Sequence, residues 1–153
     1  MMPRRHERAE GTMRNIFILI AVLGLIGVGC SKKEQPSSGG SDEGIAAGDS
    51  WLAAVDAERY DESWERACAF FKGVVPKDQW VTQVAGVRGP LGSVLSREVA
   101  SAEYSTKLPG APDGEYVVIQ YRTKFENKAS AIETVTPMRD PDGVYRVSGY
   151  YIR

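Results

Sequence analysis

The sequence contains few of the residues that most catalytic and metal centres require. It has one histidine, His6, and two cysteines, Cys30 and Cys68, among 153 residues. His6 lies ahead of a long apolar run, so the sequence beyond that run has no imidazole to carry a proton or bind a metal. The sequence has no cluster with metal-ligand spacing, and we expect neither a metal nor any other cofactor.

An excess of positive charge is also lacking. The formal net charge is -1, from 19 Lys and Arg against 20 Asp and Glu. Proteins that bind nucleic acid need a basic patch to neutralise phosphates, so we expect no nucleic-acid partner. The glycines of "GVRGPLG" do not follow a strand and open a helix, which excludes a dinucleotide-binding loop.

One long apolar run is present, from Ile16 to Gly29. Its 14 residues carry no charge. A bilayer crossing needs about 20 residues, whereas the apolar core of a secretory signal has about 7–15. Arg14 supplies the positive flank, and we expect translation to begin at Met13. Residues 1–29 are therefore predicted to be an N-terminal extension followed by a signal peptide.

The run ends in "GVGC", where Gly29 precedes Cys30. This resembles a bacterial lipoprotein signal, in which the cysteine receives a lipid and becomes the mature N-terminus. Gly27 departs from the pattern, because that family prefers Leu there. Ser31, in place of Asp, implies sorting to the outer membrane. The resemblance implies lipid attachment at Cys30 and a location in the bacterial cell envelope, anchored to the membrane and facing the periplasm.

Two other interpretations of the apolar run remain open. An uncleaved membrane anchor is one, because the run is only slightly short of a spanning helix. A cytosolic core helix is the other, although the run has no amphipathic face and adjoins a Gly/Ser-rich segment. We expect residues 30–43 to be a lipidated cysteine with a flexible tether and residues 44–153 to fold as one domain.

Apolar spacing predicts three helices, over residues 44–58, 60–72 and 76–88. In the second helix Trp64, Cys68 and Phe71 share one face. We expect Cys68 to be a small buried hydrophobe, since a reactive thiol needs a nearby base. The three tryptophans are expected in the core, because a small domain needs the apolar area that they bury.

Alternating patterns then predict four strands, over residues 93–105, 115–127, 130–140 and 144–153. In the second, one face carries Val117, Ile119, Tyr121, Thr123 and Phe125, and the opposite face should be largely wet. "DPDG" predicts a hairpin turn at Gly143. The predicted fold is α+β, with three N-terminal helices packed on a curved four-stranded antiparallel sheet.

Several motifs resemble one family. "SWERACAFFK", Trp80, "RGPLGSVLSRE" and "LPGAPDGEYVVIQYRTKFENKASAIETVTPMRDPDGVYRVSGYYI" together resemble the DUF4019 family of uncharacterised bacterial exported proteins. The resemblance covers the chain from about Ala46 onward, and its most specific pieces are residues 88–92, 109–114 and 149–151. The element order is similar to NTF2-like and cystatin-like folds. The resemblance implies a fold and a compartment but no mechanism.

A curved sheet of this kind often leaves a pocket on its concave face. In ketosteroid-isomerase-like relatives an Asp and a Tyr in that pocket transfer protons. The candidates here lie on predicted strands: Tyr104, Tyr121, Glu133, Tyr145 and Tyr151. Fold analogy alone is a weak basis for assigning catalysis, and we assign no catalytic residue.

Glu133 is the best acid for such chemistry, but we expect it to be solvent-accessible. Lys124 and Lys128 lie close in sequence and no histidine is available to share proton transfer, so it should titrate near the usual value of about 4.3. Arg88 and Arg97 have two possible roles: binding an acidic ligand, or anchoring surface loops.

These observations predict a lipid-anchored cell-envelope protein with a non-enzymatic binding or interaction domain. Its partners would be the membrane, through the lipid, and a protein or small ligand. Two alternatives remain open: a small-pocket enzyme of the ketosteroid-isomerase type, and a purely structural envelope component.

Overall fold

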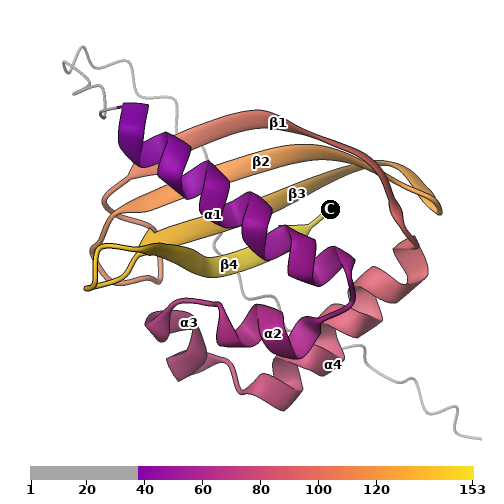
Figure 1. The fold of residues 1–153 in the computed structure, drawn as a ribbon, viewed down its shortest axis with the longest axis horizontal. Helices are drawn as coiled ribbons and strands as arrows, with labels where there is room; N and C mark the ends of the chain where they lie inside the picture. The colour runs from indigo at the N-terminus through magenta and orange to yellow at the C-terminus, as the bar shows by residue number, and fades with distance from the viewer. Residues whose placement is uncertain (1–37) are drawn as a thin grey trace, which may run out of the picture.

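The computed structural model describes residues 38–153, in which the helices come first and the sheet follows. The elements are α1 (Ser38–Asp56), α2 (Tyr60–Glu65), α3 (Ala69–Val74), α4 (Lys77–Arg88), the 3-10 turn η1 (Gly89–Leu91), β1 (Val94–Ser105), β2 (Tyr116–Phe125), β3 (Lys128–Arg139) and β4 (Tyr145–Ile152). The sheet is an antiparallel meander in the order β1-β2-β3-β4. It curves around α1, which crosses one face, while α2, α3 and α4 lie beyond β4 (Figure 1). The α+β class and the four-stranded sheet are therefore as predicted.

The expected number of three helices is wrong, because the predicted helix over residues 60–72 is broken. Cys68 is extended, with φ -67° and ψ 161°, and its thiol accepts the N–H of Phe71 as the N-cap of α3. The backbone N–H of Cys68 donates to the carbonyl of Val147 on β4 at 2.9 Å. A contact with a distant strand thus replaces the helical hydrogen bond at this position.

Helix α1 begins at Ser38, inside the segment expected to be a tether. Two of its glycines face β2. A Cβ at Gly44 would lie 2.5 Å from Val117, and one at Gly48 would lie 3.0 Å from Ile119. Glycine at these positions lets the helix backbone approach the sheet closely. Gly40, inside the expected tether, is also near the sheet, because a Cβ there would lie 3.5 Å from the Tyr145 hydroxyl.

The core lies between α1 and the inner face of the sheet. All five residues predicted to share one face of β2 are buried, and Arg122 and Lys124 on the other face are exposed. Tyr116 is an exception on that second face, since it is buried and donates its hydroxyl to the carbonyl of Pro112. The wet character of this face therefore ends where the loop after β1 covers it.

Other core predictions are mostly confirmed. Cys68 is fully buried, as expected for a small hydrophobe. Trp51 and Trp80 are buried with their rings 5.8 Å apart, and Trp51 meets Tyr150 edge-on at 5.2 Å. Trp64 is only partly buried, so its expected place in the core is only partly correct.

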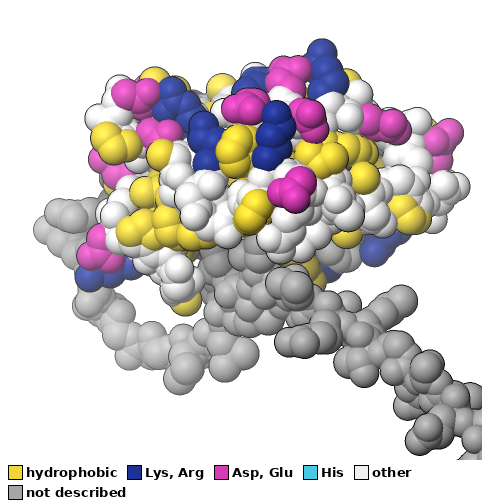
Figure 2. Space-filling model, turned by 90° about the horizontal axis from the view of Figure 1, so that it is seen from below, with side chains coloured by type: hydrophobic (Ala, Val, Ile, Leu, Met, Phe, Trp, Pro, Cys, Tyr) yellow, Lys and Arg dark blue, Asp and Glu magenta, His cyan; other side chains and the backbone are white. Residues whose placement is uncertain are grey.

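Cys30 and the predicted signal peptide lie outside the described residues. None of the described helices is both long and apolar enough to span a membrane. The face seen in Figure 2 mixes Lys and Arg with Asp and Glu side chains. This mixture agrees with the balanced charge of the sequence.

Candidate functional site

Glu133 is fully buried, and the expectation that it is solvent-accessible is wrong. Its Oε1 accepts hydrogen bonds from the Tyr150 hydroxyl at 2.5 Å and from Arg88 at 3.5 Å. Its Oε2 accepts from the Thr123 hydroxyl at 2.5 Å and from Arg97 at 2.7 Å. Burial of this charge is possible because both oxygens face donors, two of them cationic.

Asp56, exposed at the end of α1, completes what we call the buried ionic cluster, after its two buried members Arg88 and Glu133: Asp56, Arg88, Arg97 and Glu133. Arg88 donates to Asp56 at 2.7 Å, and Arg97 donates to its two oxygens at 2.6 and 2.9 Å. Two cations thus balance two carboxylates. The cluster joins the ends of α1 and α4 to β1 and β3, and it gives Arg88 and Arg97 an anchoring role rather than one in ligand binding.

The cluster changes the proton affinity of the groups around it. Burial, followed by the charge of Glu133, raises the pKa of Tyr150 well above its ordinary value. Burial alone lowers the pKa of Arg97, but its hydrogen bonds to Asp56 and Glu133 outweigh that effect and raise it. Tyr150 therefore remains a neutral donor and Arg97 a cation. Glu133 has four donors and no exposed surface, so it cannot reach a substrate as a general acid or base.

Of the tyrosines expected on the same face as Glu133, Tyr121 lies directly opposite it on β2, but none of the four donates to its carboxylate in the described structure. Tyr121 donates its hydroxyl to Asp49 on α1, Tyr104 is half-buried and Tyr151 is 48% exposed. Tyr145 is buried in a separate groove. Tyr150, which is not among the candidates expected from the sequence, is the tyrosine whose hydroxyl donates to Glu133.

A β-bulge explains why Tyr150 replaces Tyr151. In the β3–β4 register, Thr136 lies opposite Gly149 and Pro137 lies opposite Val147. No residue of β3 therefore lies opposite Ser148. An extra residue shifts the alternation of side chains by one. Strict alternation from Val147 would direct Tyr151 inward, whereas the bulge directs Tyr150 inward instead. The sequence contains no clear signal for this bulge.

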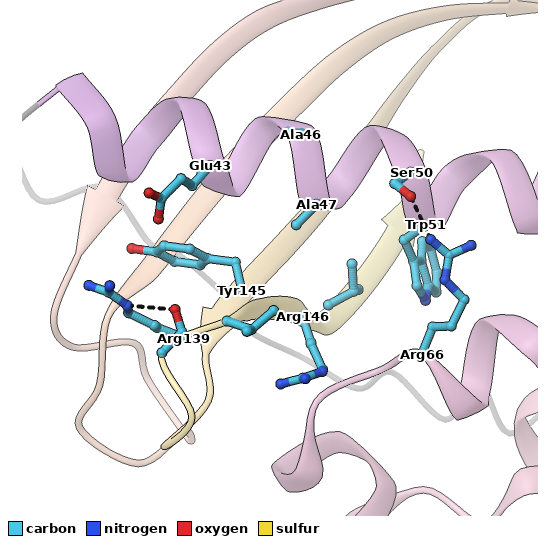
Figure 3. A pocket seen from close by; sticks show the side chains of 12 residues that line it. Glu43, Ala46, Ala47, Ser50, Trp51, Arg66, Arg139, Tyr145 and Arg146 are labelled. Carbon is cyan, nitrogen blue, oxygen red and sulfur yellow. Dashed lines mark hydrogen bonds between the residues drawn. The ribbon is translucent and has the colours of Figure 1, made fainter.

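An open groove of about 630 Å³ lies between α1 and β4, and we call it the α1–β4 groove. Glu43, Ala46, Ala47 and Ser50 form its α1 wall, and Trp51, Tyr145 and Val147 contribute its aromatic and apolar lining. In Figure 3 Tyr145 reaches from β4 toward α1 near Glu43, and Arg66 lies at the other end beside Ser50 and Trp51. The volume is within the range of ligand sites.

Charges around the α1–β4 groove are unevenly neutralised. Arg146 pairs with Asp140 and Asp142 at 2.8 to 3.0 Å, and Arg139 pairs with Glu115 at 3.1 Å. Arg66 donates to Ser50 at 2.5 Å and meets Glu62 at 3.3 Å.

Glu62 is shared, since it also pairs with Arg59 at 3.1 Å. Arg66 is therefore the least neutralised of the arginines that line the groove. No hydrogen bond or ion pair within residues 38–153 engages the Glu43 carboxylate, which leaves an acid at the opposite end.

No three His, Cys, Asp or Glu side chains between residues 38 and 153 form a group that could hold a metal ion. Apart from Asp49 and Glu43, the carboxylates described above are engaged by arginines. What the site offers is a groove lined by apolar side chains and charges of both signs.

Comparison with curated proteins gives no match. Comparison with protein families matches residues 47–150 to the family described as "Protein of unknown function (DUF4019)". The matched region contains the whole buried ionic cluster and most of the α1–β4 groove. Because the match covers more than half of the chain, this protein belongs to the DUF4019 family.

Proposed function

We propose that this protein is a lipid-anchored domain of the bacterial cell envelope that binds a protein or small ligand in the α1–β4 groove without catalysing a reaction. The observation that carries the proposal is that Glu133, the best candidate for a catalytic acid, is fully buried and hydrogen-bonded on both carboxylate oxygens. The groove, by contrast, is open and lined by apolar and charged side chains. An NTF2-like or cystatin-like ancestry of the sheet is part of the same proposal.

The anchor in this proposal is a lipid on Cys30, in an outer membrane with the domain facing the periplasm. Support comes from the short apolar run, Gly29 before the cysteine, and the polar stretch that follows it. Each buried acyl CH₂ contributes about 0.8 kcal/mol, so several chains would hold the protein firmly.

Metabolic labelling with an alkyne analogue of palmitate tests the anchor. The full chain should take up label, and a Cys30→Ala variant should not. Cys68 provides the matched control, because it is buried in the core and its replacement by Ala should leave labelling intact. Equal labelling of the Cys30→Ala variant would disprove lipid attachment at this residue.

Site-specific photocrosslinking in cells tests the groove. A benzophenone amino acid at Ala46, on the groove wall, should give a defined adduct on irradiation. The same amino acid at Arg122, exposed on the opposite face of the sheet, should not. Equal adducts at both positions, or none at Ala46, would remove the groove as a binding site.

A further inference from the structure

We infer that the ligand of the α1–β4 groove is an extended peptide segment of a partner protein, carrying a basic side chain and an acidic side chain about 10 Å apart. The inference rests on the proposed function, in which this groove binds a ligand. Two ends of the groove carry opposite charges that the groove's own residues leave unbalanced, and these charges identify the ligand.

One end of the groove is acidic. Glu43 lines it there, and no ion pair within the described residues engages its carboxylate. The nearby cation, Arg139, is already bound to Glu115 at 3.1 Å and to the carbonyl of Gly143 at 3.0 Å. A cationic side chain of a ligand would therefore be attracted to Glu43.

The other end is basic. The guanidinium of Arg66 is fixed by Ser50, and its side chain remains 37% exposed. Its only carboxylate partner among residues 38–153, Glu62, is shared with Arg59. Two cations therefore share one acid here, and a carboxylate of the ligand would restore the balance.

The distance between the acidic and basic ends of the groove indicates which class of ligand can contact both. Glu43 and Ser50 are seven residues apart on α1, which corresponds to about 10 Å along the helix axis. An amino acid or a zwitterionic lipid headgroup carries its opposite charges only a few bonds apart and does not span this length. A polyanion is disfavoured because Arg139 and Arg146 are already neutralised.

An extended peptide fits both the spacing and the shape. In the polyproline II conformation three residues span about 9 Å and return to the same face of the chain. Ala46 and Ala47 separate the two charged ends, and their small side chains leave room for a peptide backbone beside the helix.

A blocked peptide with the core Lys-Pro-Ala-Glu is the probe, since its two side chains are its only charges. Its dissociation constant for the full chain in detergent can be measured by tryptophan fluorescence and compared with a peptide in which Lys and Glu are adjacent. We expect the spaced peptide to bind more tightly. Equal affinity of the two peptides would overturn the inference.

Double-mutant cycles then assign the contacts. Arg66→Gln should weaken binding about threefold, as should Glu→Gln in the peptide, because rim ion pairs are modest. The two changes together should weaken binding no further if Arg66 and the peptide carboxylate form a pair. Glu43→Gln with norleucine in place of the peptide lysine tests the other end, and Arg122→Gln is the matched control.

The outcomes separate this inference from the function on which it rests. Fully additive effects in both cycles would show that the peptide charges do not meet Glu43 and Arg66, and would overturn the inference. An Ala46 adduct that excess peptide fails to suppress would also overturn it, while leaving the groove as a binding site. Absence of the adduct would remove the inference and the proposed function together.

Discussion

Arg97 donates its Nε hydrogen to Oε2 of Glu133 over 2.7 Å, which joins β1 to β3 across the intervening strand β2. Glu133 is fully buried and the Arg97 side chain is 15% exposed. Ions in such surroundings lose their hydration, so a partner left alone is costly even where the intact pair adds little stability. The buried ionic cluster should therefore be judged by what happens when one member is removed.

Glu133→Gln should lower the free energy of unfolding by about 3–5 kcal/mol, because of the acids in the described structure it leaves Arg88 and Arg97 paired with Asp56 alone. Urea unfolding of the purified protein measures the change. Glu98→Gln is the matched control, since Glu98 forms an exposed pair with Arg122 and should cost less than about 1 kcal/mol. A loss at Glu133 no larger than that of the control would show that the cluster does not hold the helices to the sheet.

Because Tyr150 is buried, we expect the free energy of unfolding to fall at alkaline pH. Burial raises its pKa in the folded protein above that of the unfolded chain, so the folded state retains a proton that the unfolded state releases. The stability linked to this proton is intact below about pH 10, the usual pKa of tyrosine, and falls as the pH rises above it.

A Tyr150→Phe variant should show a shallower decrease in unfolding free energy between pH 9 and pH 11 than the unmodified protein. Burial also raises the pKa of Tyr121 and Tyr116. Only the difference in slope between the Tyr150→Phe variant and the unmodified protein therefore reports on Tyr150. Identical slopes would contradict the prediction.

The sheet could be predicted from the sequence because its signals are local. Alternation marks β2 over five inward residues, and the turn after Asp140 requires a residue with positive φ, which Gly143 supplies at 83°. The break at Cys68 and the bulge at Ser148 have no such signals. The first depends on a hydrogen bond to Val147 and the second on the register with β3.

Burial of Glu133 cannot be predicted from the sequence for a related reason. A charged residue in an alternating strand is normally assigned to the solvent face, and the nearby Lys124 and Lys128 favour that assignment. The partners that bury it are Arg97, 36 residues earlier, and Arg88, 45 residues earlier. Their convergence is a product of the fold and cannot be read from local charge.

Arg146 should control the ionisation of Asp142 at the β3–β4 turn. Its hydrogen bond, followed by one from the backbone N–H of Val144, lowers the pKa of Asp142 to about 2. A lowered pKa contributes stability at pH values above the ordinary 3.8, and that stability is lost as the pH falls toward 2.

Arg146→Gln should return the pKa of Asp142 most of the way toward 3.8. A carboxyl-carbon NMR titration measures it directly. Arg139→Gln, which removes a neighbouring cation that pairs with Glu115 instead, is the control and should leave Asp142 nearly unchanged. An unaltered pKa in the Arg146→Gln variant would mean that the Val144 N–H alone sets it.

We expect that removing the hydroxyl of Tyr145 stabilises the protein. Tyr145 is 5% exposed, and its hydroxyl is buried without a hydrogen-bond partner in the described structure. It lies beneath α1, 3.5 Å from the point that a Cβ on Gly40 would occupy. A buried polar group without a partner costs about 1–3 kcal/mol.

Tyr145→Phe removes this hydroxyl and keeps the ring, so it should raise the free energy of unfolding by about 1 kcal/mol. Tyr116→Phe is the matched comparison, because Tyr116 is also buried in the sheet but donates its hydroxyl to the Pro112 carbonyl at 2.6 Å. That variant should lose about 1 kcal/mol, since it leaves a carbonyl unpaired. Thermal and urea unfolding of both variants should thus change in opposite directions. A loss of stability in Tyr145→Phe as large as that in Tyr116→Phe would show that the Tyr145 hydroxyl has a partner in solution.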